Sequence, residues 1–179
     1  MTVLSMEKPI RKQNRLKEWS YSNGGVYFLT VCTKDRAKIL SSVRPDPNGA
    51  YFYGGDEFRL TVELTPLGKI VEKYLLEAEK TGRFLVEDFV IMPNHMHILL
   101  GIPGDVLRDK EQGVAFHEEV PKFLSGFKTL CHKAAGDKFL QRSAYDHVIR
   151  NQYDYDEIAR YMHQNPARWY HRELYGTEE

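Results

Sequence analysis

Two histidines, His95 and His97, lie one residue apart in the apolar run from Val86 to Ile102. On a β-strand successive side chains point to opposite faces, so both imidazoles face one side while Met96 faces the other. Two neutral imidazoles at this separation can bind one divalent metal ion through a ring nitrogen each. The same spacing also fits two ordinary, half-exposed strand histidines, so other parts of the chain must decide between the two interpretations.

Tyr161 and Asn165 form a second pair, four residues apart in a segment whose apolar spacing predicts a helix. Their phenol and carboxamide groups therefore face the same side, about one turn apart. If this helix covers the histidines, Asn165 could supply a third ligand to a hard cation and Tyr161 a nucleophile beside it. Tyr161 equally fits a core contact of an amphipathic helix, and Asn165 followed by Pro166 fits a helix stop.

Length and composition indicate one globular domain, since the chain has 179 residues, 42% of them hydrophobic and 28% charged. The N-terminal residues lack the apolar core of a signal peptide, and no run reaches the roughly 20 apolar residues of a membrane span. Cys32 and Cys131 have no CxxC spacing, so they are expected to be core thiols and not part of a disulfide or zinc site. We therefore expect a cytoplasmic protein that does not bind membranes.

The charge is balanced overall but unevenly distributed. The 25 Lys and Arg residues equal the 25 Asp and Glu residues, whereas nucleic-acid-binding domains are commonly basic. Residues 121–150, however, contain six Lys and Arg against two Asp, and residues 1–20 are expected to form a basic, partly mobile arm. Each basic side chain here also fits a solvated surface charge. The candidate phosphate contacts are Lys122, Lys128, Arg142 and Arg150.

Periodicity and turn signals predict alternating strands and helices. The expected elements are a strand over 26–33, a hairpin excursion with runs over 50–53 and 58–64, a helix from about 65, strands over 84–92 and 95–102, a helix over 120–135, an extended piece over 143–150 and a helix over 154–169. Thr65 suits the N-cap of the first helix and Pro66 its first position. Pro93 and Asn94 break the two apolar strands apart, so these should pair antiparallel. The last helix should end soon after Pro166.

This order predicts an α+β fold of the ferredoxin-like or RRM-like kind, in which helices pack mainly on one face of an antiparallel sheet. No internal repeat or linker is evident, so residues 1–179 should form a single domain. His95 and His97 would stand on a central strand of the sheet.

Several stretches of the chain resemble a known family. The segment "PNHMHILL" resembles the HUH motif of single-tyrosine transposases, in which two histidines flank one apolar residue. The chain as a whole is most similar to the REP-associated tyrosine transposases, through "GGVYFLTVCTKDR", "FLSGFKTLCHKAAG" and "QRSAYDHVIRNQYDYDEIARYMHQNPARW". These stretches occur in the family's order and together span nearly the whole chain.

The resemblance implies a metal-dependent single-stranded DNA endonuclease and strand transferase, acting near DNA hairpins through a covalent 5′-phosphotyrosine. It assigns the nucleophile to Tyr161 and the metal ligands to His95, His97 and Asn165, with Gln164 as a substitute for Asn165. The implied cofactor is Mg²⁺ or Mn²⁺, and the implied partner is single-stranded or hairpin DNA, bound by a monomer or a homodimer.

Three other functions remain open from the sequence. The fold could be retained as a hairpin-DNA-binding module without cleavage, or as a structural metal-binding domain. A histidine-based nucleotide hydrolase would need a third alternating histidine, but Leu99 occupies that position. The chain also departs from the transposase pattern at Leu140, where members of that family often carry a Trp before Gln and Arg. That departure concerns packing or DNA contact and leaves the proposed chemistry intact.

Overall fold

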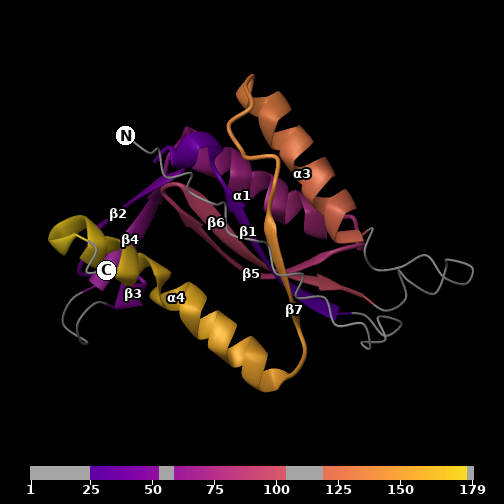
Figure 1. The fold of residues 1–179 in the computed structure, drawn as a ribbon. Coiled ribbons are helices and arrows are strands. Elements are labelled where there is room, and N and C mark those ends of the chain that lie inside the picture. The colour runs from indigo at the N-terminus through magenta and orange to yellow at the C-terminus, as the bar shows by residue number, and fades with distance from the viewer. Residues whose placement is uncertain (1–24, 53–58, 104–118, 177–179) are drawn as a thin grey trace, which may run out of the picture.

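The computed structural model describes residues 25–52, 59–103 and 119–176 (Figure 1). The expected basic arm over residues 1–20 lies outside these ranges. No helix in the described part of the chain has the length and hydrophobicity needed to cross a membrane. Cys32 and Cys131 are both free and buried, which confirms that they are core thiols.

The main sheet has four strands in the order β5-β6-β1-β7, and all neighbouring strands are antiparallel. The strands are β1 (Gly25–Cys32), β5 (Leu85–Met92), β6 (His95–Ile102) and β7 (Tyr145–Ile149). With helices between β1 and β5 and between β6 and β7, this is the ferredoxin-like split βαβ arrangement. The predicted α+β class is therefore confirmed, and β6 is a central strand.

Of the three α-helices in the described ranges, two cover one face of this sheet, as predicted. Helices α1 (Pro66–Glu79) and α3 (Glu119–Ala135) lie together on one side of the sheet in Figure 1, and α4 (Gln152–Tyr175) lies on the other. The larger core, between the sheet and α1 and α3, includes Leu29, Met96 and Phe127. The smaller core, beneath α4, includes Phe28 and Trp169. Since both faces are covered, all eight residues of β6 are buried.

Local chemistry explains where the helices begin and end. The Thr65 side chain accepts a hydrogen bond from the backbone N–H of Gly68, and Pro66 occupies the first turn of α1, as expected. Helix α3 ends before Gly136, whose φ of 74° lies in the left-handed region that favours glycine. Asn151 caps α4 by accepting a hydrogen bond from the N–H of Asp154.

The predicted hairpin excursion is a second, three-stranded sheet in the order β2-β4-β3. Its strands are β2 (Ser41–Pro45), β3 (Tyr51–Phe52) and β4 (Arg59–Leu64). The sequence analysis found the two later strands and missed β2, whose short serine- and proline-containing stretch carries a weak strand signal. Residues 53–58, which join β3 to β4, lie outside the described ranges.

The expectation that α4 would end soon after Pro166 is wrong. The helix continues for nine residues beyond it, to Tyr175, with Pro166 in its interior. Proline lacks the N–H that would bond the carbonyl of Met162, which normally ends or kinks a helix. Here Met162, Pro166 and Trp169 are buried on the side of α4 that faces the sheet, so packing maintains the helix through the proline.

Candidate active site

The two histidines are buried beside each other on the face of the sheet that α4 covers. His95 pairs with Cys32 of β1 and His97 with Thr30, and the two imidazole ring centroids are 4.7 Å apart. His95 is 8% exposed and His97 3%. The alternation of side chains along β6 thus brings both rings into one small space.

Each imidazole is oriented by a hydrogen bond to its Nδ1 atom. The Nδ1 of His95 lies 2.7 Å from Oδ1 of Asn94, and because a carboxamide oxygen only accepts, this Nδ1 is the donor. The Nδ1 of His97 lies 2.9 Å from the hydroxyl of Thr30. The Nε2 atom of His97 is buried and has no hydrogen-bond partner among the described residues. A buried nitrogen of this kind is a suitable position for a metal ligand.

Burial keeps both imidazoles neutral. Burial, helped by the nearby guanidinium groups of Arg36 and Arg172, lowers the pKa of His95 to about 4, against a hydrogen bond with Asn165 that raises it. Burial also lowers the pKa of His97 to about 3, with His95 contributing. The neutral imidazole is the form that binds metal ions, so no proton has to leave at neutral pH.

Helix α4 brings the predicted tyrosine and asparagine to the same place. Asn165 is 4% exposed, and Tyr161 is 38% exposed with its ring centroid 5.3 Å from that of His97. Both residues, together with His95 and His97, line a pocket of about 430 Å³. The structure therefore assembles the candidate ligands and the candidate nucleophile from two elements that are far apart in sequence.

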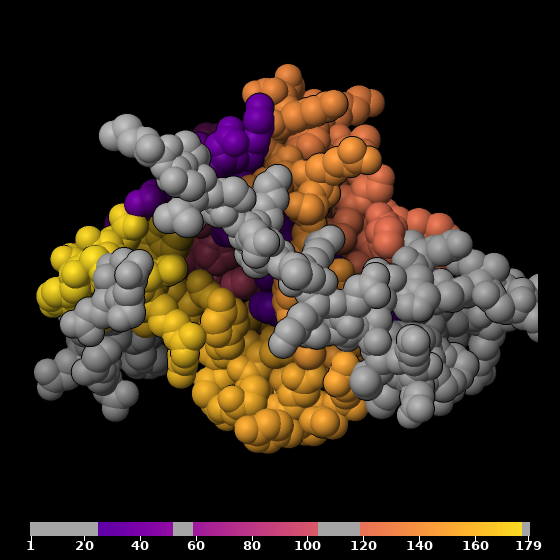
Figure 2. Space-filling view, viewed as in Figure 1, coloured from indigo at the N-terminus to yellow at the C-terminus, as the bar shows by residue number. Residues whose placement is uncertain are grey.

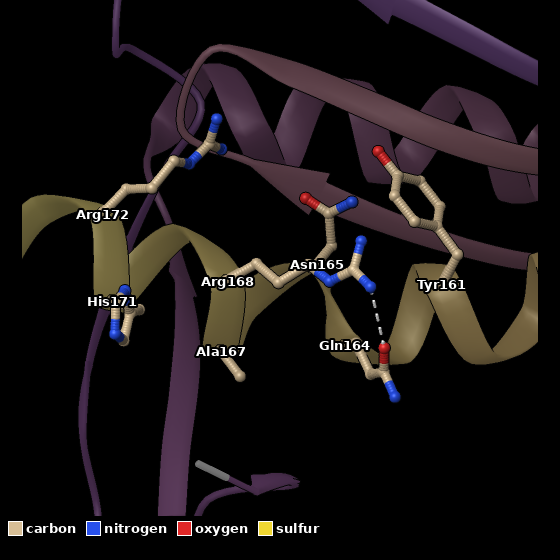
Figure 3. Close-up of a pocket in the computed structure, with 7 residues that line it drawn as sticks. All are labelled: Tyr161, Gln164, Asn165, Ala167, Arg168, His171 and Arg172. Carbon is tan, nitrogen blue, oxygen red and sulfur yellow. Dashed lines mark hydrogen bonds between the residues drawn. The ribbon is translucent and has the colours of Figure 1, made fainter. Parts of the chain in front are cut away.

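Gln164, the substitute for Asn165, is directed elsewhere. In Figure 3 the side chains of Tyr161, Asn165 and Arg172 extend from one side of α4, and Gln164 extends from the other. The Gln164 carboxamide oxygen accepts a hydrogen bond of 3.2 Å from Arg168. Asn165 is consequently the carboxamide that faces the histidines.

The sequence analysis missed three arginines around this pocket. Arg36 and Arg172 line it, and the guanidinium of Arg168 lies 5.4 Å from the centroid of the Tyr161 ring. The spacing of positions 161, 165, 168 and 172 places Tyr161, Asn165, Arg168 and Arg172 on one face of the helix. Arg168 lies within the helix predicted over 154–169, whereas Arg172 joins this face only if the helix is extended beyond residue 169. Nothing in the sequence pattern points to Arg36.

The four candidate phosphate contacts have different environments. Lys128 is 8% exposed, and its Nζ donates to the carbonyl oxygens of Arg142 and Ser143, so it has a structural role in this conformation. Lys122 lies 3.4 Å from the carboxylate of Glu119 on α3. Arg142 is exposed, and Arg150 is half-buried. None of the four lines the pocket that holds the histidines.

The donor set fits a divalent ion. Among the described residues no group of three or more His, Cys, Asp or Glu side chains is arranged to hold a metal. The candidate site instead combines two imidazoles with the carboxamide of Asn165, and the buried Nε2 of His97 lacks a protein partner in the described part of the chain. Two imidazole nitrogens and a carboxamide oxygen are donors that a divalent metal ion can accept.

The architecture thus defines a ferredoxin-like α+β domain with paired strand histidines facing a tyrosine on a helix. No family model matches the chain. A Haemophilus influenzae protein named "Uncharacterized protein" is 26% identical over 184 residues, which cover 92% of this chain and 93% of the relative. A second protein of that organism, named "Putative REP-associated tyrosine transposase", is 26% identical over 152 residues, covering 83% of this chain and 73% of the relative.

A solved structure of a REP-associated tyrosine transposase bound to a REP hairpin has the same fold. The TM-score is 0.55 at 20% identity, and the match covers 86% of this chain and 73% of that one. The solved structure supports the fold, and the named Haemophilus relative supports the family. The chain is therefore similar in sequence and in fold to REP-associated tyrosine transposases, and this similarity supports a transposase-family function.

Proposed function

We propose that this protein is a metal-dependent single-stranded DNA endonuclease and strand transferase that cuts near DNA hairpins, with Tyr161 as its nucleophile. One observation carries the proposal, namely that Tyr161 and Asn165 of α4 share one pocket with His95 and His97 of β6. In phosphoryl transfer a buried, neutral imidazole pair can hold a metal ion, and a solvent-accessible phenol can act as the nucleophile. Within the described ranges the buried Nε2 of His97 has no hydrogen-bond partner, and a bound metal ion would supply one.

A divalent ion held by His95, His97 and Asn165 would supply positive charge next to a DNA phosphate. The chain adds positive charge of its own, because Arg36 and Arg172 line the same pocket. Guanidinium groups bind phosphate oxygens through paired hydrogen bonds, which would fix the scissile phosphate relative to the tyrosine.

The Tyr161 oxygen would attack phosphorus in line with the bond to the 3′-oxygen. The phosphorus–Oη bond forms as the phosphorus–O3′ bond breaks, leaving a 5′-phosphotyrosine on the protein and a 3′-hydroxyl on the other DNA piece. The phenol proton passes to solvent, which Tyr161 reaches, and the leaving oxygen takes up a proton. Arg168, over the tyrosine ring, interacts favourably with the charge that develops on the phenol oxygen. The retained phosphoester allows rejoining to a second strand.

Aromatic side chains around the pocket suit unpaired bases. Tyr145 is exposed, lines the pocket and lies edge-on to Phe28 at a centroid distance of 6.5 Å. Trp169 also lines the pocket, with its ring centroid 6.2 Å from that of His95, but it is buried, so Tyr145 is the ring available for stacking. Because every base has a stacking face, such rings bind single strands with little dependence on sequence. The substrate that fits best is single-stranded DNA beside a hairpin, and the similar solved structure is bound to a REP hairpin.

The test is a denaturing gel of the protein with Mn²⁺ and labelled single-stranded hairpins taken from DNA that flanks its own gene. We expect a covalent protein–DNA band for the wild type and none for Tyr161→Phe. Tyr153→Phe is the matched control, since Tyr153 is an exposed tyrosine of the same helix that does not line the pocket. A band that persists in Tyr161→Phe would refute the assignment. Hairpin binding without any band in the wild type would favour a binding module that does not cleave DNA.

A further inference from the structure

A second pocket, of about 790 Å³, lies between the 3₁₀ turn η2 (Lys34–Arg36) and the segment that leads from α3 to β7. Three of its lining side chains are basic, namely Lys34, Lys138 and Arg142, and one, Asp35, is acidic. Figure 2 shows the indigo surface that follows β1 beside the orange surface of the later segment. We call this the basic pocket.

The positive charge of the basic pocket is not neutralised within the described part of the chain. Lys34, Lys138 and Arg142 are exposed, and none forms an ion pair with another described residue. By contrast, the exposed Lys38 pairs with Glu173 at 2.7 Å. Three cations converging on one concavity repel one another, so an anion that binds there gains from all three.

The walls of the basic pocket are held in place by hydrogen bonds. The backbone N–H of Lys34 donates to the carbonyl of Phe139 at 2.7 Å, and that of Gln141 to the carbonyl of Cys32 at 2.8 Å. The buried ammonium of Lys128 donates to the carbonyls of Arg142 and Ser143 at 3.1 and 3.4 Å.

A buried ammonium is costly unless its protons are bonded, so this arrangement ties the loop firmly to α3. Lys128 therefore supports the loop that presents Arg142, and its own charge faces the protein.

The basic pocket and the candidate active site meet at the end of β1. Lys34 lines the first, and Arg36, two residues later, lines the second. Asp35 and Arg36, with φ of 55° and 56°, adopt the left-handed conformation, which turns the chain between the two pockets. The backbone N–H of Thr33, just before this turn, donates to the carbonyl of Asn94 in the active-site wall at 3.0 Å. The turn η2 therefore contributes one basic side chain to each pocket.

We infer that the basic pocket binds backbone phosphates of the same DNA strand whose scissile phosphate lies at Tyr161. The inference rests on the proposed function and adds Lys34 and Lys138 to Arg142 as its phosphate contacts. Flexible lysines and an exposed arginine suit phosphates, which need charge without base recognition. The shared turn η2 favours DNA over an acidic polypeptide, since one strand can occupy both pockets.

The experiment measures binding of a labelled hairpin with a single-stranded flank across a salt series, using fluorescence anisotropy. The proteins are the wild type, the triple variant Lys34→Ala/Lys138→Ala/Arg142→Ala, and Lys80→Ala, an exposed lysine at the end of α1. Each lost phosphate contact reduces the slope of log K against log salt by about 0.7 to 0.9. We expect the triple variant to lose about 2 from the slope and at least about tenfold in affinity, and Lys80→Ala to lose little.

Two outcomes overturn the inference. One is a triple variant whose slope matches that of Lys80→Ala while its circular dichroism is unchanged. The other is a labelled polyglutamate peptide that binds the wild type as tightly as the hairpin and loses the same slope in the triple variant. The covalent-band assay on the same proteins separates the two proposals. A reduced slope without any covalent band retains the basic pocket and refutes cleavage, whereas a normal band with an unchanged slope refutes the basic pocket alone.

Discussion

The buried histidine pair predicts that the metal-free protein loses stability in mild acid. In the unfolded chain both histidines titrate near the ordinary pKa of 6.5, whereas burial lowers the folded-state pKa to about 4 for His95 and about 3 for His97. As the pH falls below 6.5, the two histidines therefore bind protons in the unfolded state but not in the folded state. The free energy of unfolding then declines until the pH approaches the folded-state pKa values. Above about pH 7.5 the pair contributes almost no pH dependence.

The structure sets the size of this effect. At about pH 5 an unfolded histidine is almost fully protonated, and the folded pair remains largely neutral. Each histidine therefore lowers the free energy of unfolding by about 2 kcal/mol. Because both rings are nearly inaccessible to solvent, screening reduces this little, and the pair together costs about 4 kcal/mol. For a chain of this size that corresponds to a fall in melting temperature on the order of 10 °C.

The assay is thermal melting followed by circular dichroism in EDTA, at about pH 7.5 and about pH 5. The double variant His95→Gln/His97→Gln cannot titrate at these positions, so its melting temperature should fall much less between the two pH values. His163→Gln is the control, because this histidine is exposed on α4 and its contact with Asp88, at 3.3 Å, is a surface pair whose loss should change the response little. If the melting temperatures of the wild type and the double variant fall by the same amount between the two pH values, the imidazoles do not titrate as the buried site requires.

Two further predictions concern stability elsewhere in the fold. Gly68→Ala in α1 should lower the free energy of unfolding by more than about 1 kcal/mol, since a Cβ there would lie 2.1 Å from a backbone carbonyl oxygen. Gly126→Ala in α3 should raise it by about 0.5 to 1 kcal/mol, because its Cβ meets no atom within 4 Å. Urea denaturation measures both free energies, and changes of the same sign would contradict the packing. Arg83→Met removes the bidentate partner, at 2.9 and 3.0 Å, of the buried Glu119 carboxylate, and should lower the free energy of unfolding by about 2 kcal/mol or more. A loss within about 0.5 kcal/mol would mean that this ion pair contributes like a surface pair.

Features that depend on short-range chemistry were predictable from the sequence. The alternation of side chains on a strand is enough to place His95 and His97 on one face, and the helical repeat does the same for Tyr161 and Asn165. The N-cap at Thr65 follows equally from local rules, because capping needs one oxygen and one nearby N–H. Each of these features can be predicted without knowledge of what packs against the strand or helix.

Features that depend on tertiary context were not predictable. Lys128 has the sequence signature of a surface lysine, and only the fold shows its ammonium buried against two carbonyls between α3 and the following loop. Arg36 reaches the active site from a turn with two left-handed residues, a conformation that Asp35 and Arg36 give no signal to expect. Strand β2 forms because β4 offers it a partner, with Ser41 opposite Leu64.

The continuation of α4 through Pro166 links the fold to the chemistry. An interior proline costs about 3 kcal/mol in a helix, so the burial of neighbouring side chains must offset that cost. If the helix ended at Asn165, the ligand candidate would lie on a fraying terminus, and Arg168 and Arg172 would not share its face. By continuing, α4 presents Asn165 from a packed interior turn and extends the same stripe to both guanidinium groups. The packing that holds the helix together through its proline thus also keeps the proposed nucleophile, the candidate carboxamide ligand and the proposed phosphate-binding arginines on one face.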